Sequence, residues 1–101
     1  MKFVCTNALR EYMAKKDRQV ICVEVASSNA SDFEVTEIFL RLAKESFASY
    51  LIEKKKYRRY PLEGGGSVLL PPYRLEYDEV ITFDRKKKWL IYVLSQEGIR
   101  L

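Results

Sequence analysis

The sequence predicts a small, β-rich single domain of the α+β class with one or two helices. Residues 1–101 suit one domain and are too few for two. Hydrophobic residues make up 48% of the chain, which is enough for a packed core without disulfides or metal. Three runs rich in β-branched and aromatic residues have the composition of strands: Gln19–Ala26, Glu79–Phe83 and Trp89–Leu94.

The N-terminal part predicts a strand, a short helix and a second strand. Lys2–Thr6 has strand composition, and its last residue or Asn7 can cap a following helix. Gln19–Ala26 (QVICVEVA) is the clearest strand, and the polar residues Ser27-Ser28-Asn29 end it. Apolar residues at one-turn spacing extend the helix to about Lys16: Ala8, Leu9, Tyr12 and Met13.

Residues 32–57 fit two secondary structures. Ser31 followed by Glu34 is a capping-box pattern, which favours a helix. Phe33–Leu42 (FEVTEIFLRL) is also rich in β-prone residues that alternate as in a strand. Periodicity favours a helix over the whole stretch, and Ala43–Lys55 is helical on either interpretation. The residues at helical spacing are Val35, Ile38, Phe39, Leu42, Ala43, Phe47 and Tyr50.

The second half predicts a loop, a short strand and a hairpin. Tyr57–Ser67 contains a proline and three consecutive glycines, which indicate a loop. Ser67–Leu70 is a short strand, stopped by two prolines. Glu79–Phe83 and Trp89–Leu94 flank five charged residues, 84–88, which predicts a hairpin with a five-residue loop. The last glycine predicts a final turn before the C-terminus.

The residue inventory excludes several kinds of catalytic and metal site. Histidine is absent, so Ser-His, Cys-His and His-metal arrangements cannot form. The two cysteines, Cys5 and Cys22, lie in strand-like runs, which favours free buried thiols over a disulfide between neighbouring strands. Two separated cysteines cannot assemble a structural zinc site. We therefore expect no catalytic residues, no metal ligands, no cofactor and no enzymatic activity.

Two further motifs favour structural interpretations. Gly64–Ser67 is followed by apolar residues and prolines rather than by the lysine and helix of a phosphate-binding loop. A turn is the favoured interpretation. Glu76–Glu79 holds three carboxylates in four residues, which could act in acid–base chemistry or hold a hard cation. No second constellation faces them in the sequence, so a solvated turn is favoured.

Basic residues gather in two groups that we name the 54–59 group and the 85–88 group. Aromatic residues accompany both, and cations with stacking surfaces are typical of nucleic-acid binding. The alternative is a solvated helix end and a solvated hairpin loop, which a net charge of only +4 favours. A shared face would support nucleic-acid binding. The candidate basic surface comprises Lys54, Lys55, Lys56, Arg58, Arg59, Arg85, Lys86, Lys87 and Lys88.

Hydropathy and the N-terminus predict a cytoplasmic domain without a membrane partner. The longest apolar runs, Val20–Val23 and Trp89–Leu94, are far shorter than the roughly 20 residues of a membrane span. Met1–Thr6 lacks the apolar segment of a signal peptide. The aromatic, strand-rich second half favours a protein partner or a second copy of the chain as the binding partner.

Three stretches together resemble the HesB-like iron–sulfur biogenesis domain, especially its short stand-alone relatives in Gram-positive bacteria. They are Lys2–Lys15 (KFVCTNALREYMAK), the strand Gln19–Ala26 with the run ending Phe39–Leu42, and Val68–Leu101 with its ending EGIRL. The resemblance covers nearly the whole chain. It implies a compact β-rich fold with small helices at its edge, and it makes Phe33–Leu42 a strand.

The resemblance brings no iron–sulfur site to this chain. That family's chemistry rests on a cysteine, or selenocysteine, in the turn after the second strand and on a Cys-x-Cys near the C-terminus. The corresponding residues here are Ser27-Ser28-Asn29 and Gly98–Leu101, and neither segment contains cysteine. The expected function is a non-catalytic HesB-like scaffold domain that acts through protein contacts. The alternative is a small nucleic-acid-binding module that uses both basic groups.

Overall fold

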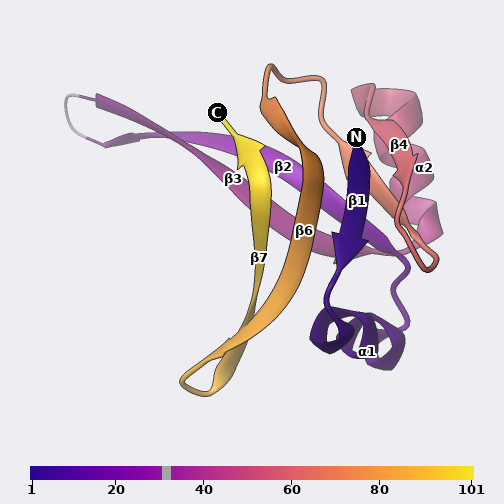
Figure 1. Ribbon diagram of the computed structural model, residues 1–101. Helices are drawn as coiled ribbons and strands as arrows, with labels where there is room; N and C mark the ends of the chain where they lie inside the picture. Colours follow the sequence, from indigo (N-terminus) through magenta and orange to yellow (C-terminus); the bar gives the residue numbers. More distant parts are fainter. Residues whose placement is uncertain (31–32) are drawn as a thin grey trace.

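Seven strands and two helices make up the part of the chain that the structure, a computed structural model, describes: residues 1–30 and 33–101 (Figure 1). Strands dominate, and the fold is of the α+β class predicted from the sequence. In chain order the elements are β1 (Lys2–Cys5), α1 (Asn7–Lys16), β2 (Val20–Ala30), β3 (Phe33–Ala43), α2 (Glu45–Lys55), β4 (Arg58–Pro61), β5 (Ser67–Leu70), β6 (Glu76–Lys88) and β7 (Ile91–Arg100).

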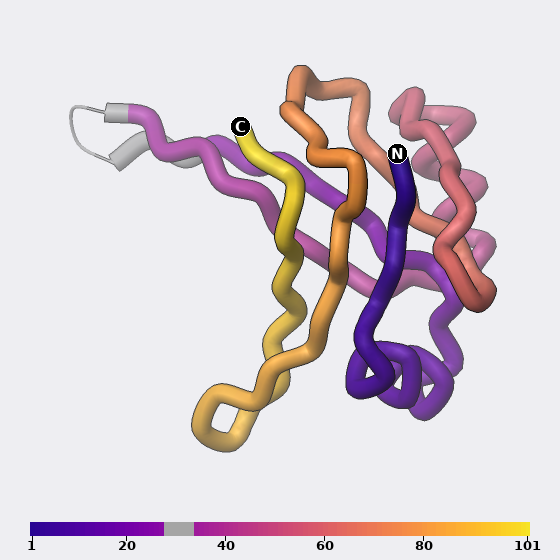
Figure 2. Tube along the Cα trace, in the orientation of Figure 1, coloured from indigo at the N-terminus to yellow at the C-terminus, as the bar shows by residue number. Residues whose placement is uncertain are grey.

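The strands form two sheets that mix parallel and antiparallel pairs. One sheet has the order β1-β6-β7, and the other has the order β3-β2-β5-β4. The pairs β1–β6 and β2–β5 are parallel, whereas the remaining neighbours are antiparallel. The chain path in Figure 2 shows the two hairpins, β2–β3 and β6–β7, extending away from the helices. The two parallel pairs join segments far apart in sequence.

The main core lies between the two sheets. Phe3, Ile81 and Phe83 face inward from the three-stranded sheet, while Ile21 and Val23 face them from β2. Helix α1 closes this core with its apolar side. The remaining buried members are Leu9, Met13, Leu62, Val68, Leu70, Leu75 and Ile99.

A second cluster lies on the other face of the four-stranded sheet, beneath α2. Val20 and Cys22 of β2 pack with Leu69 of β5 against Ala48 and Leu51 of the helix. Strand β2 is therefore covered on both faces, and its residues 20–23 are at most 1% exposed. Burial on both sides explains why this segment reads as an unbroken apolar run instead of an alternating one.

Helix α1 and the strands beside it match the sequence prediction. The Thr6 side chain caps the helix by accepting a hydrogen bond from the backbone N–H of Leu9 at 3.3 Å. The same hydroxyl donates to Asp84 Oδ1 at 2.5 Å, which ties the helix start to β6. At the other end Asp17 adopts a left-handed conformation with φ of 53° and ends the helix.

The helix favoured by periodicity over residues 33–42 is wrong, because Phe33–Ala43 is strand β3. Ile38, Leu40 and Leu42 alternate along β3 and pack against the main core. Ile38 and Leu42 are also four residues apart, so the same apolar residues fit the period of a helix as well as that of a strand. The strand implied by the HesB-like resemblance is confirmed here, and so is the helix that follows, Glu45–Lys55.

The predicted five-residue hairpin loop is also wrong. Strand β6 continues through the 85–88 group, and only Trp89 and Leu90 form the turn, with Lys88 paired to Ile91. The run of charged residues suggested a loop. On a two-stranded hairpin, however, these side chains stay in solvent while the backbone of β6 pairs with β7. The acidic run Glu76–Glu79 likewise belongs to β6 rather than to a turn.

The predicted loop 57–67 contains a strand, Arg58–Pro61, which pairs with β5. This strand is the outer strand of its sheet, where proline is tolerated because one side needs no backbone donor. The short strand Ser67–Leu70 is confirmed as predicted. The glycine-rich turn is also confirmed: it connects β4 to β5, and a strand rather than a helix follows it.

Gly98 lies within β7 instead of forming a final turn. It adopts φ of 115° opposite an irregularity in β6 between Tyr77 and Thr82. A Cβ at this position would lie 2.9 Å from the carbonyl oxygen of Val80 and 3.2 Å from Cα of Ile81. The absence of a side chain therefore lets the two backbones meet at the bulge.

We expect Gly98→Ala to destabilise the protein more than Gly65→Ala does. Both glycines have φ near 116°, so backbone strain of roughly 1–2 kcal/mol applies to each. Only Gly98 adds a backbone clash, since the nearest atom to a Cβ on Gly65 is a flexible arginine nitrogen 3.9 Å away. Urea unfolding of both variants measures the difference, and equal losses would contradict the close packing at the bulge.

Candidate interaction groove

A groove of about 640 Å³ lies between β3 and β7, the outer strands of the two sheets. Its apolar floor consists of Ile38, Leu40 and Leu42 from β3 and Leu94 from β7, all half-buried. These side chains face the groove because alternation along each strand turns them toward the opposite sheet. The remaining lining residues are Tyr12, Lys16, Arg18, Phe39, Tyr92, Val93, Ser95 and Gln96.

The charged lining residues of the groove are all positive. Lys16 lies in the last turn of α1, and Arg18 follows the helix. No carboxylate of the described residues lines the groove. Cations at the end of a helix also complement its dipole, and Asp17 between Lys16 and Arg18 is not among the lining residues. The groove thus combines an apolar floor with a cationic rim.

Two tyrosines that line the groove, Tyr12 and Tyr92, pack against each other and against Arg85. The rings of Tyr12 and Tyr92 lie 5.5 Å apart, centroid to centroid, and are tilted by 57°. The Arg85 guanidinium carbon lies 4.3 Å from the Tyr92 centroid and 5.8 Å from that of Tyr12. Its Nε is buried without a hydrogen-bond partner among the described residues. Cation–π contacts therefore hold Arg85 against the two tyrosines.

The groove is bounded by two sheet edges. Strands β3 and β7 each have a neighbouring strand on one side only. The outer edge of such a strand presents unpaired backbone N–H and C=O groups. An extended chain lying in the groove could therefore pair with backbone groups while its side chains reach the apolar floor.

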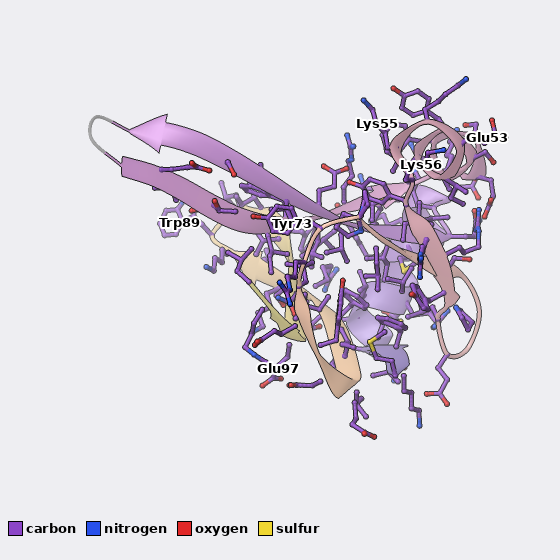
Figure 3. The ribbon with its side chains drawn as sticks, turned by 90° about the horizontal axis from the view of Figure 1, so that it is seen from above. Glu53, Lys55, Lys56, Tyr73, Trp89 and Glu97 are labelled. Atoms are coloured by element: carbon purple, nitrogen blue, oxygen red, sulfur yellow. The ribbon has the colours of Figure 1, made fainter. Side chains whose placement is uncertain are left out.

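The structure separates the two predicted basic groups. Lys54–Lys56 end helix α2, and Arg58 and Arg59 begin β4, whereas the 85–88 group lies near the tip of the β6–β7 hairpin. Figure 1 shows α2 and this tip at opposite ends of the molecule. In the perpendicular view, Lys55 and Lys56 again lie far from Trp89 (Figure 3). The two groups do not form one face.

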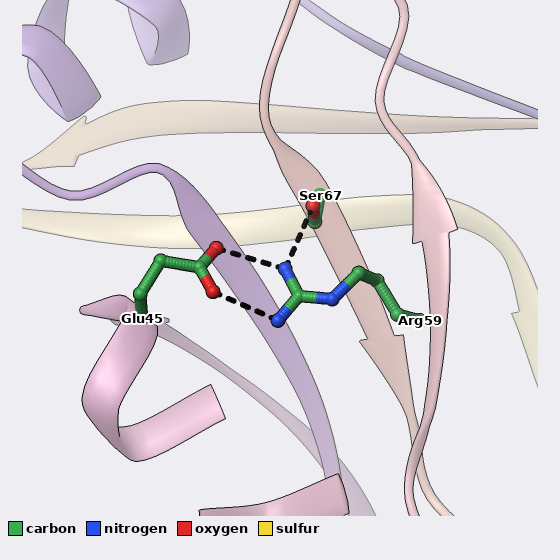
Figure 4. Close-up of polar contacts among 3 residues, drawn as sticks. All are labelled: Glu45, Arg59 and Ser67. Atoms are coloured by element: carbon green, nitrogen blue, oxygen red, sulfur yellow. Dashed lines mark hydrogen bonds and ion pairs between the residues drawn. The ribbon is translucent and has the colours of Figure 1, made fainter. Parts of the chain in front are cut away.

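Within the 54–59 group, Arg59 has a structural partner. Its guanidinium donates to both carboxylate oxygens of Glu45 at 2.8 Å and to the hydroxyl of Ser67 at 3.0 Å (Figure 4). These hydrogen bonds lower the pKa of Glu45. The pair connects the first turn of α2 to β4, so Arg59 is not free to bind phosphate.

Alternation divides the 85–88 group between two faces of the hairpin. Arg85 and Lys87 share a face with Tyr92 and thus lie on the groove side. Lys86 and Lys88 point to the opposite face. The group therefore surrounds the hairpin rather than forming a single plane.

The two cysteines are free and pack in different clusters. Cys22 is buried beneath α2, and this burial raises the pKa of its thiol to about 11, which keeps it protonated and unreactive. Cys5 is half-buried against the main core. Within residues 1–30 and 33–101, no three metal-binding side chains of the Cys, Asp and Glu types gather in one place.

The other two sequence motifs have structural partners. Arg10 donates to the backbone oxygens of Glu63 and Gly65 and so fills the concave side of the glycine turn. Arg100 lies 2.9 Å from Asp78 and 3.9 Å from Glu76, so the acidic run pairs with the end of β7. These motifs contribute to the fold.

Comparisons with known proteins identify no relative. No family model matches the chain, and neither a curated protein nor a solved structure matches it. The HesB-like resemblance consequently stays a prediction. None of the helices in the described residues is long and apolar enough to cross a membrane.

Sequence reasoning did not identify the groove. Tyr12 was assigned to the apolar side of its helix, and Tyr92 to a strand. The residues that meet in the groove come from α1, β3 and β7, which are distant in sequence. The one available signal was the basic pair Lys16 and Arg18 at the end of the first helix, and two cations alone do not indicate a groove.

We expect Glu45→Gln to lower stability at neutral pH by less than about 1 kcal/mol, because the ion pair is largely exposed. The folded-state pKa of Glu45 is lowered, so its contribution is present above the unfolded-state pKa and is lost as pH falls. The wild-type protein should then lose more stability than Glu45→Gln between pH 7 and about pH 3. Urea unfolding across this range measures the difference.

Glu53→Gln on the same helix is the matched control. Glu53 is exposed and forms no ion pair with any described residue. Its substitution should leave the acid dependence unchanged. Identical pH profiles for the two variants would contradict a stabilising role for the Glu45–Arg59 pair.

Proposed function

We propose that this chain is a non-catalytic interaction domain of HesB-like outline that binds an extended segment of a partner protein. The groove between β3 and β7 carries this proposal, because it combines two sheet edges, an apolar floor and a cationic rim, and none of its described lining residues is a carboxylate. The fitting segment alternates apolar residues with carboxylates. We place the domain in the cytoplasm, in keeping with its free thiols.

The shape of the groove favours an extended peptide over a compact small molecule. Strand edges recognise peptides through backbone hydrogen bonds, and pockets for alternate side chains supply specificity. The floor residues Ile38, Leu40 and Leu42 are spaced every second position along β3, which matches the side-chain repeat of an extended ligand. Lys16 and Arg18 would then meet the ligand's carboxylates.

The side chains available as metal ligands support a role without a cofactor. The chain has no histidine, and the high pKa of Cys22 disfavours the thiolate that a metal or cluster requires. Cys5 and Cys22 pack in separate clusters and cannot both face one metal ion. The nucleic-acid alternative has weaker support, because its two basic groups lie at opposite ends of the molecule.

The test of the groove begins with a phage-displayed library of random peptides selected on the intact protein. We expect the enriched peptides to alternate apolar and acidic residues. Synthetic versions, measured by fluorescence polarisation, should bind Lys16→Glu/Arg18→Glu at least tenfold more weakly than wild type. Loss of two attractive contacts and gain of two repulsive ones underlies this expectation.

Lys54→Glu/Lys55→Glu is the matched control, since it changes net charge equally in the last turn of α2 and neither lysine lines the groove. It should bind the peptides like wild type. Peptides that bind both variants equally, or a selection without a consensus, would contradict the proposal. Light scattering tests whether a second copy of the chain occupies the groove instead. A dimer that Lys16→Glu/Arg18→Glu abolishes and the control variant retains would assign the groove to that second copy.

We expect anaerobically purified protein to contain no stoichiometric iron or zinc, since the chain has no histidine and only two cysteines, and no three metal-binding side chains gather among the described residues. Elemental analysis by mass spectrometry measures the content directly. A ratio near one metal per chain that Cys22→Ser abolishes would contradict the cofactor-free function.

A further inference from the structure

The β6–β7 hairpin ends in the most exposed apolar residues of the described structure. Trp89 and Leu90, the two turn residues, are 91% and 83% exposed, and Ile91 beside them is 63% exposed. Trp89 has φ of +59°, a conformation that two-residue hairpin turns usually assign to glycine or asparagine. The sequence thus places its largest apolar side chain at the outermost point of a hairpin, at a conformational cost.

Cations surround this apolar tip. Lys86 and Lys88 lie on one face of the hairpin, and Lys87 lies on the other, while Arg85 packs against Tyr92 farther from the turn. The segment from Arg85 to Leu94 contains no carboxylate. Burial does not explain the apolar residues, and none of the three exposed lysines forms an ion pair with a described residue.

We propose that this tip binds the surface of an anionic membrane. Trp89 and Leu90 would enter the boundary between headgroups and acyl chains, where tryptophan is favoured. The exposed lysines Lys86, Lys87 and Lys88 would meet the anionic headgroups, which attract cations near the surface. Their long apolar stems can lie along the interface while the charges stay hydrated.

The composition of the tip favours a membrane over the other candidates. The bases of a nucleic acid would stack on Trp89 and its phosphates would bind the cations. It has no apolar surface that would bury the aliphatic side chains of Leu90 and Ile91. A protein socket would need an acidic rim around the entire hairpin, because the cations lie on both faces. The anionic cytoplasmic leaflet supplies both an apolar layer and negative charge.

This inference revises the expectation that no membrane takes part. That expectation rested on the length of the apolar runs. Their length decides whether a segment can span a membrane, but not whether a domain binds the membrane surface. The inference is also independent of the proposed peptide groove, because neither Trp89 nor Leu90 lines that groove. Failure of either experiment leaves the other proposal standing.

Trp89 is the only tryptophan of the chain, so its fluorescence reports on the tip directly. The probe is a titration with vesicles of phosphatidylcholine, with or without phosphatidylserine. We expect a blue shift of the emission and protection from acrylamide quenching only with the anionic vesicles. Binding should weaken as salt is raised, because the cations act by screened attraction.

Three variants assign the effect to the tip. Leu90→Ser keeps Trp89 as the fluorescent reporter. It should bind about tenfold more weakly, because it loses roughly half of the free energy that burial of a leucine side chain contributes. Lys86→Glu/Lys88→Glu should abolish the blue shift, whereas Lys54→Glu/Lys55→Glu, with an equal charge change elsewhere, should retain most of it. All of these residues are exposed, and circular dichroism verifies that each variant folds.

The outcomes that overturn the proposal are distinct. An unchanged emission spectrum with anionic vesicles would exclude insertion of the tip. Equal loss of binding in both double-charge variants would show general attraction of a basic protein. Quenching of Trp89 by single-stranded oligonucleotides, without a vesicle response, would assign the tip to nucleic acid instead.

Discussion

The architecture depends on the burial of β2 and β5 on both faces. Ile21 and Val23 of β2 contribute to the core between the sheets, while Val20 and Cys22 contribute to the cluster beneath α2. This one strand therefore holds three layers together: the helix, the four-stranded sheet and the three-stranded sheet. Apolar burial of this extent is the dominant favourable term in folding. The surfaces at which function is proposed lie at the margins of these layers.

Segments with one dominant signal could be predicted from the sequence. Thr6 and the apolar side of α1 identified the first helix, and Ser67–Leu70 was isolated by turn residues on both sides. Prediction failed where one pattern fits two periods, as in β3, or where charge suggested a loop, as at Arg85–Lys88. In both places the deciding factor was a partner strand, which local sequence does not specify.

The candidate sites show the same division. The basic groups were visible as runs of residues, yet their separation depends on the path of β6 away from α2. The groove could not be foreseen at all, since its lining comes from α1, β3 and β7. Trp89 was recognised as an aromatic residue beside cations, but its place at a two-residue turn follows only from the register of the hairpin.

The parallel pairing of β1 with β6 has a consequence for synthesis on the ribosome. Lys2–Cys5 pairs with Val80–Phe83, and the hydrogen bond from Thr6 to Asp84 spans 78 positions of the chain. The first strand thus has no sheet partner until residues 80–83 have emerged from the ribosome. Until then, the apolar residues of β1 are exposed to solvent or covered only transiently by other parts of the chain. The three-stranded sheet therefore forms only after β6 has been made, and long-range pairing of this kind is slow compared with local structure.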